Sequence, residues 1–122
     1  MKTTTAVVIE DDPALTHSIS TVLRGEGFTV HAAVSGPEGV ETVQATHPAI
    51  VTMDLRLPGF DGPEAIRRIR SFSNVPILII SASNDLTDLQ SGLGAGADGY
   101  VVKPVSAPIL QARIRALLRR PA

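Results

Sequence analysis

Short apolar runs alternate along this chain with longer stretches in which apolar side chains recur every three or four positions. The runs lie at residues 6–9, 28–30, 50–53, 77–80 and 100–102. Each run is short and is bounded by polar or turn-forming residues, which indicates a buried strand. The intervening stretches have a helical period, as in the set Leu15, Ile19, Val22 and Leu23. The pattern therefore predicts strand and helix alternating five times.

Residues that favour helix termini support this assignment. Polar side chains suited to an N-cap precede four of the helical stretches: Asp12, Ser35, Asp61 and Ser106. A glutamate follows three residues after two of them, which gives a capping box at Ser35 and Glu38 and repeats the pattern at Asp61 and Glu64. The first helix is expected to stop at Gly25 or Gly27.

The last two helices differ in their expected strength. The fourth rests on Leu86, Leu89 and Leu93, and nearby glycines would each cost about 1 kcal/mol in a helix interior. We expect it to be the least stable helix. The fifth carries apolar side chains on one face: Leu110, Ile114, Leu117 and Leu118. Arginines lie along or beyond it, which favours a solvated or partner-facing surface over a DNA reader: Arg113, Arg115, Arg119 and Arg120.

Alternating strands and helices are typical of α/β proteins in which helices cover both faces of a parallel sheet. Right-handed crossovers leave few strand orders, and 2-1-3-4-5 is a common one. We expect a single flavodoxin-like (βα)5 domain over residues 1–122. Residues 119–122 are typical of a domain edge, and the sequence leaves open whether an effector domain follows.

Composition narrows the range of functions. The net charge of −1, from 11 basic and 12 acidic residues, gives no electrostatic case for nucleic acid or membrane binding. The aromatic fraction of 3% argues against base stacking by this domain. Cysteine is absent from the sequence, which excludes disulfides and cysteine nucleophiles. No apolar run approaches the roughly 20 residues of a membrane span, so we expect a cytoplasmic protein.

Charged and hydroxyl side chains stand at the carboxyl ends of four predicted strands. Glu10 and Asp11 follow the first strand, Asp54 the third, Ser81 the fourth and Lys103 the fifth. In the expected order these ends meet at one edge of the sheet, where open α/β sheets bind ligands. Clustered carboxylates repel each other, and Mg²⁺ with its preference for oxygen ligands would relieve the repulsion. Lys103 and Ser81 would remain as donors to an anion, which makes Asp54 a candidate nucleophile on phosphorus.

Taken singly, the same residues have simpler interpretations. Glu10, Asp11 and Ser81 would serve as cap or turn residues, Asp54 as a loop acid and Lys103 as a solvated strand-end lysine. Their joint occurrence at four strand ends is what favours a functional site. The histidines lack the spacing of metal ligands and are predicted to lie at the surface: His17, His31 and His47.

Four segments together resemble the receiver domain of bacterial two-component response regulators: VVIEDDP at 7–13, IVTMDLRLPGFDG at 50–62, ILIISA at 77–82 and GADGYVVKP at 96–104. The resemblance covers essentially the whole chain. It implies that Asp54 is the phosphoacceptor and that a sensor histidine kinase supplies the phosphoryl group. Glu10 and Asp11 match the acidic pair that holds Mg²⁺, with the Arg56 main-chain carbonyl as a further ligand.

The resemblance also implies a switch. Ser81 matches the residue that turns toward the phosphoryl group, and Lys103 matches the lysine that pairs with it, in a Lys103–Pro104 bond that is usually cis. Tyr100 matches the aromatic residue that swings inward. Arg56 and Ser83 occupy the two positions that tune the phosphate lifetime. A phosphoryl group adds roughly −1.5 to −2 charge, which would bias the fourth helix and fifth strand.

The region from residue 96 to Arg113 is most similar to receivers of the OmpR/PhoB type, which are winged-helix transcription regulators. Those receivers usually form dimers through the fourth helix, fifth strand and fifth helix with cross-subunit ion pairs. Asp98 and Arg113 match that pattern, whereas four other positions depart from it: Ser91, Gly94, Gly99 and Ile109. We therefore expect that a homodimer on this face is either absent or uses a more apolar contact.

The residues and the resemblance together favour a regulatory switch rather than a turnover enzyme, and the resemblance implies transcription as its output. One alternative is a pseudo-receiver that binds partners without phosphate. Another is a Mg²⁺-dependent phosphotransferase or phosphatase, which commonly has a second aspartate two residues after its nucleophile, where this chain has Arg56. A nucleotide-binding flavodoxin-like module would need a glycine-rich loop after the first strand, where this chain has three acids.

Overall fold

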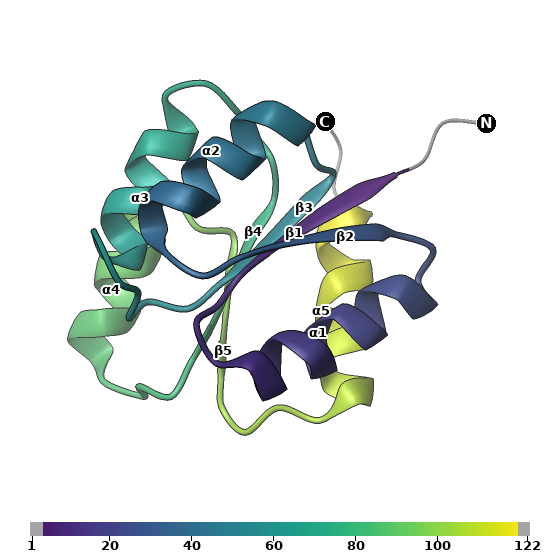
Figure 1. Ribbon diagram of the computed structural model, residues 1–122. Coiled ribbons are helices and arrows are strands. Elements are labelled where there is room, and N and C mark those ends of the chain that lie inside the picture. Colours follow the sequence, from purple (N-terminus) through teal and green to yellow (C-terminus); the bar gives the residue numbers. More distant parts are fainter. Residues whose placement is uncertain (1–3, 120–122) are drawn as a thin grey trace.

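The computed structural model describes residues 4–119 and shows five strands alternating with five helices (Figure 1). The strands are β1 (Thr5–Ile9), β2 (Thr29–Ala33), β3 (Ile50–Met53), β4 (Ile77–Ser81) and β5 (Gly99–Val102). The helices are α1 (Pro13–Gly25), α2 (Gly36–Thr46), α3 (Gly62–Arg70), α4 (Leu86–Ala95) and α5 (Ala107–Leu118). Residues 1–3 and 120–122 of the expected 1–122 domain, Arg120 among them, lie outside the described residues.

The strands form one parallel sheet in the order β2-β1-β3-β4-β5, which confirms the predicted topology. Helices α1 and α5 cover one face, and α2, α3 and α4 cover the other (Figure 1). Because all strands run the same way, their carboxyl ends share one edge. The register pairs Ile9 with Met53 and Ser81 with Val102, so β1, β3, β4 and β5 end at nearly the same level.

The core has two parts, one on each face of the sheet. Alternate residues of the central strands point to opposite faces, as the pleat requires. Val51 and Met53 pack with Ile66 and Ile69 of α3, whereas Ile50 packs with Ile114 of α5 and with α1. Every residue of β3 and β4 is buried, which confirms that these apolar runs are strands covered on both faces.

Three of the four predicted N-caps form a side-chain hydrogen bond. Asp12 accepts from the Ala14 N–H, and Ser35 and Ser106 cap α2 and α5 in the same way. Asp61 stands at the N-cap of α3 as predicted, but its side chain makes no cap hydrogen bond. The start of α3 is held instead by its backbone, because the Gly62 N–H donates to the Leu55 carbonyl at 2.9 Å.

The second strand is longer than predicted and begins later. Phe28 is not part of it; its side chain is buried beneath α1 and its N–H donates to the Leu23 carbonyl at the end of that helix. The strand continues to Ala33 because it pairs with β1 residue for residue, from Thr5 with Thr29 to Ile9 with Ala33. A short apolar run cannot show how far a neighbouring strand extends the pairing.

Two of the three leucines on which α4 was predicted to rest are not buried against the core. Gly92 is its buried position, whereas Leu86 is 65% exposed and Leu93 is also exposed. If Gly92 had a Cβ atom, that atom would lie 2.3 Å from the Cδ1 of Ile79 in β4. The helix therefore lies too close to β4 for residue 92 to have a side chain. At the end of α5, Leu118 is likewise exposed although Leu110 and Ile114 are buried.

The histidine prediction is confirmed for two of three residues. His17 and His47 are exposed, and His31 is half-buried on the edge strand β2. His47 ends α2 in the left-handed conformation, with φ of 49°. The arginines in and just after α5 that the structure describes are exposed: Arg113, Arg115 and Arg119.

Candidate functional site

Three carboxylates meet where β1 and β3 end. Glu10 and Asp54 directly follow the last residues of these strands and are buried, whereas Asp11 is exposed. One oxygen from each of Glu10, Asp11 and Asp54 can be chosen so that all three lie within 4.8 Å of one another. The structure therefore brings together the acids that the sequence placed at separate strand ends.

Lys103 reaches this cluster from the end of β5. Its Nζ donates to the Asp54 Oδ2 at 2.7 Å and to the Glu10 Oε1 at 3.3 Å. The Lys103–Pro104 peptide bond is cis, as the resemblance implied. One ammonium thus bridges two carboxylates whose side chains are largely removed from water.

Burial and the neighbouring charges shift the ionisation of this cluster. Burial raises the pKa of the Glu10 carboxyl, and the charge of Asp54 acts in the same direction; the Asp12 N–H and Lys103 oppose it only partly. Burial alone would lower the pKa of Lys103, but its hydrogen bond to Asp54 and the charges of Asp54 and Glu10 outweigh that effect, so the pKa is raised. The site therefore holds its lysine charged and leaves excess negative charge that a cation would stabilise.

The loop after β3 holds Asp54 in place through backbone contacts. The Arg56 N–H donates to the Asp54 Oδ1 at 3.1 Å, and the Asp54 N–H donates to the Ile9 carbonyl. Gly62 packs against this loop so closely that an added Cβ would lie 2.7 Å from the Asp54 carbonyl oxygen. The glycine at the start of α3 is therefore what lets the helix terminus approach the acid.

A second group of polar residues lies at the end of β4. Ser81 is buried, and its Oγ accepts from the Ser83 N–H at 3.3 Å. Tyr100 on β5 is half-buried, packs against the core beneath α2 and α3, and donates its hydroxyl to the Ser83 carbonyl at 2.9 Å. The predicted switch residues Ser81 and Tyr100 are thus joined through Ser83.

Asp88 is a site residue that the sequence analysis did not single out. Its Oδ2 accepts from the Arg56 Nη2 at 3.0 Å and from the Ser83 Oγ at 2.7 Å. An aspartate in the first turn of a helix has a simple explanation, because its negative charge interacts favourably with the positive end of the helix dipole. Since Arg56 lies 32 residues away in the chain, no local pattern could have indicated this contact.

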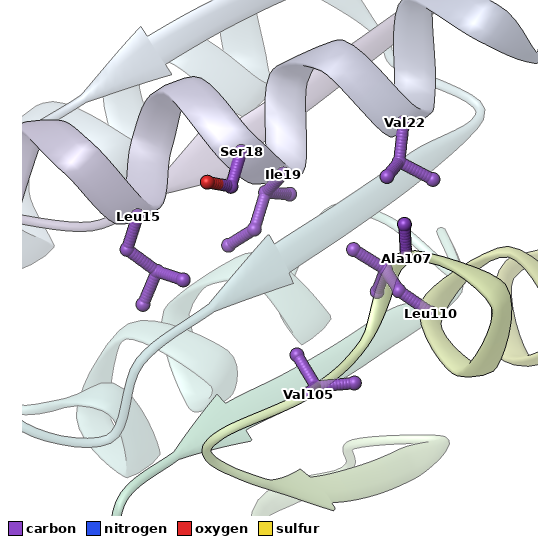
Figure 2. A pocket seen from close by; sticks show the side chains of 7 residues that line it. All are labelled: Leu15, Ser18, Ile19, Val22, Val105, Ala107 and Leu110. Atoms are coloured by element: carbon purple, nitrogen blue, oxygen red, sulfur yellow. The ribbon is translucent and has the colours of Figure 1, made fainter.

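A small apolar pocket of about 50 Å³ lies apart from the acids, between α1 on one side and α5 with the segment that leads into it on the other (Figure 2). Its lining is Leu15, Ser18, Ile19, Val22, Val105, Ala107 and Leu110. The one hydroxyl among them, that of Ser18, donates to the Ala14 carbonyl of its own helix. The pocket therefore offers packing space and no charged group for the chemistry of the acidic site.

The fold and the site together define a class: a flavodoxin-like domain with three acids and a lysine at the carboxyl edge of its sheet. The family model for the response regulator receiver domain matches residues 6–115. The chain belongs to this family, the receiver modules of two-component signalling. No helix within residues 4–119 is long and apolar enough to cross a membrane.

Comparisons with individual proteins agree with this assignment. The chain is 44% identical to the transcriptional regulatory protein AfsQ1 of Streptomyces coelicolor over 93% of its own length and 51% of that protein. It is 42% identical to the DNA-binding response regulator MtrA of Mycolicibacterium smegmatis, again over 93% of this chain and 50% of that protein. The chain thus spans about half the length of these curated relatives.

Solved structures of the same family are also similar. A putative response regulator from Chloroflexus aurantiacus superposes with a TM-score of 0.90 at 32% identity, covering 98% of this chain and 100% of the other. The receiver domain of the sensor histidine kinase PA1611 from Pseudomonas aeruginosa has a TM-score of 0.88 at 28% identity, covering 98% and 100% of the two chains. That structure has a magnesium ion coordinated in its active site cleft.

Proposed function

We propose that this chain is a phosphorylation-controlled switch in which Asp54 accepts a phosphoryl group from a sensor histidine kinase. The observation that carries the proposal is the environment of Asp54: a buried carboxylate, bound to Lys103 at 2.7 Å, with oxygens of Glu10 and Asp11 within 4.8 Å. A buried acid of this kind has a structural cost. Its position at the carboxyl edge of the sheet supports a role in binding and chemistry instead.

The donor set fits Mg²⁺. Glu10, Asp11 and Asp54 offer carboxylate oxygens in one cluster, and Glu10 has its pKa raised because burial disfavours its charge. Mg²⁺ prefers hard oxygen ligands and typically takes one or two carboxylates together with waters and phosphate oxygens. Glu10, Asp11 and Asp54 would hold it, with the main-chain carbonyl of Arg56 as the further ligand. When bound, Mg²⁺ supplies positive charge that offsets the phosphoryl oxygens.

The residues of the chain account for the transfer itself. A carboxylate oxygen of Asp54 forms the new bond to phosphorus while the bond from phosphorus to the donor breaks. Lys103, held between Asp54 and Glu10, neutralises charge on the phosphoryl oxygens. Because the pKa of Lys103 is raised, it remains an ammonium throughout. The phosphotransferases and phosphatases considered above commonly have a second aspartate two residues after the nucleophile, where this chain has Arg56. The domain is therefore expected to act as a switch and not as a turnover enzyme.

The response to phosphorylation would begin at Ser81. The Ser81 hydroxyl turns toward the phosphoryl group. Tyr100 moves inward as the hydrogen bond between its hydroxyl and the Ser83 carbonyl breaks. Movement of Ser83 carries the α4 terminus with it, since the two are joined through Asp88. The face formed by α4, β5 and α5 would then change. Arg56 and Ser83 would tune the phosphate lifetime.

The output proposed for the whole protein is transcription, controlled from an effector domain beyond this receiver. The transcriptional relatives, of which this chain spans about half, support that proposal. The domain itself is expected to be cytoplasmic and to make no direct contact with nucleic acid. A homodimer through α4, β5 and α5 would use an apolar contact, because exposed apolar side chains occur on all three elements: Leu86, Leu93, Val102 and Ile109.

The test is the intact mass of the chain after incubation with acetyl phosphate and Mg²⁺. Wild type is expected to gain one phosphoryl group, and Asp54→Asn none. Asp61→Asn is the matched control, because Asp61 is an exposed acid in the same loop that makes no cap hydrogen bond. Chelation of Mg²⁺ should prevent the gain, and size exclusion of the phosphorylated sample would report the dimer.

Absence of the gain in wild type under all donors and Mg²⁺ concentrations would contradict the proposal. The chain would then be a pseudo-receiver that binds partners without phosphate. If Asp54→Asn still gained the phosphoryl group, the phosphoacceptor would be a residue other than Asp54.

A further inference from the structure

One carboxylate oxygen of Asp88 joins three separate segments of the chain. Asp88 lies in the first turn of α4, and its Oδ2 accepts from Arg56 in the loop after β3 and from Ser83 in the loop after β4. The Asp88 side chain is 24% exposed, whereas that of Arg56 is 69% exposed. Arg56 therefore lies across the surface and is oriented mainly by its contact with Asp88.

Both partners of Asp88 are tied directly to the site. Arg56 donates its N–H to the Asp54 Oδ1 at 3.1 Å. Ser83 is held at three points besides Asp88: its N–H donates to the Ser81 Oγ, its carbonyl accepts from Tyr100, and its own Oγ accepts from the Asp85 N–H. A movement of Ser81 toward Asp54 has to break or carry these contacts.

We propose that Asp88 is a positioning residue that opposes phosphoryl acceptance at Asp54, by holding Arg56 and Ser83 in the arrangement described here. This inference rests on the proposed function. Two physical effects act in the same direction. Asp88 competes with a phosphoryl group for the guanidinium of Arg56, which such a group would attract. The Asp88–Ser83 hydrogen bond anchors the loop that Ser81 must move.

A purely structural role for Asp88 predicts something different. A negative charge near a helix N-terminus stabilises the helix through its dipole. Removing that charge would therefore destabilise α4 whether or not Asp54 is phosphorylated. Asp85 provides the matched control, since it is an exposed acid at the N-cap of the same helix and bonds the Thr87 N–H. Asp85→Asn removes the same charge and keeps an N-cap residue.

The experiment measures the binding of beryllofluoride with Mg²⁺, a mimic of the phosphoryl group, by titration calorimetry on the purified chain. Asp88→Asn is expected to bind about three- to tenfold more tightly than wild type, because its amide oxygen still accepts hydrogen bonds but without the charge that strengthens them. Asp85→Asn should stay within about twofold of wild type because its contacts are local. After acetyl phosphate treatment, the phosphate lifetime should be longer in Asp88→Asn than in wild type and in Asp85→Asn.

A double-mutant cycle separates positioning from a helix effect. In the Arg56→Ala, Ser83→Ala background Asp88 has lost both partners, so Asp88→Asn should change the affinity little. Asp88→Glu, which keeps the charge, should restore affinity toward that of wild type. Equal affinities for Asp88→Asn and Asp85→Asn, or a full effect in the double-mutant background, would overturn the inference while wild type still binds. Failure of wild type itself to bind would overturn the proposed function and this inference together.

Discussion

Thr52 shows at the scale of one residue how a polar side chain can be buried without a partner. It lies in the middle of β3, between Val8 of β1 and Leu78 of β4, and is almost fully buried. Its hydroxyl makes no hydrogen bond within the described part of the chain. A buried hydroxyl without a partner costs roughly 1–3 kcal/mol in proteins.

Thr52→Val is therefore expected to raise the free energy of unfolding by about 1 kcal/mol, because valine keeps the shape and removes the unpaired hydroxyl. Urea unfolding of both chains measures it. Thr52→Ser is the control: it keeps the hydroxyl and loses a methyl group, so it should be less stable than wild type. A valine variant no more stable than wild type would show that the hydroxyl has a partner in solution.

Helix α4 shows at the scale of an element how two glycines in one helix can have opposite roles. Gly92 faces β4 and leaves no room for a side chain, since its added Cβ would lie 2.3 Å from the fully buried Ile79. Gly94 is exposed, and nothing lies within 4 Å of the position of its Cβ. Composition alone would treat the two residues alike.

Gly94→Ala is expected to stabilise the protein by about 0.5–1 kcal/mol, because alanine loses less backbone entropy in a helix. Gly92→Ala is expected to destabilise it by about 1–3 kcal/mol, since the overpacking outweighs the helix propensity. Thermal unfolding of the two variants beside wild type compares them directly. A Gly92→Ala variant as stable as wild type or more stable would show that α4 is not packed on Ile79 as described.

At the scale of the whole molecule, an ion pair joins the first helix to the last. Glu26 is the C-cap of α1, and its carboxylate accepts from the Arg115 Nε at 2.7 Å, the Arg115 Nη2 at 3.1 Å and the Gln111 Nε2 at 2.9 Å. These partners lie in α5, up to 89 residues further along the chain. The two-point geometry favours a fixed pairing of the two helices on their shared face of the sheet.

The pair also gives the stability a dependence on pH. The hydrogen bond from Arg115, followed by that from Gln111, lowers the pKa of Glu26 in the folded chain. A carboxyl group whose pKa is lowered on folding stabilises the folded state at pH values above the ordinary glutamate pKa. This contribution is lost as the pH falls through the lowered pKa. Glu26→Gln should thus be less stable than wild type at neutral pH, and the difference should disappear in acid.

Denaturant unfolding of wild type and Glu26→Gln across that pH range measures the effect. Glu41→Gln is the control, because Glu41 is an exposed acid of α2 on the opposite face of the sheet. A difference for Glu26→Gln that stays constant with pH would mean that the carboxylate charge does not contribute.

The sequence alone determined the order of the elements and the set of residues at the site edge. Strand and helix periods are local, and caps such as Ser35 act within a few residues. Once the strands are parallel, their polarity brings Glu10, Asp54, Ser81 and Lys103 to one edge, and the structure places them there.

Tertiary structure decided which distant residues meet. The contact of Arg56 with Asp88, the pairing of Glu26 with Arg115 and the burial of Gly92 in place of Leu86 depend on how each helix is rotated and how closely it packs. The leucine stripe of α4, Leu86, Leu89 and Leu93, predicted a helix, but its outer members are exposed because the helix is rotated to place Gly92 against the sheet. Contacts between segments far apart in the chain carry no local signal, so only the packed fold shows that Asp88 contacts Arg56 and Ser83.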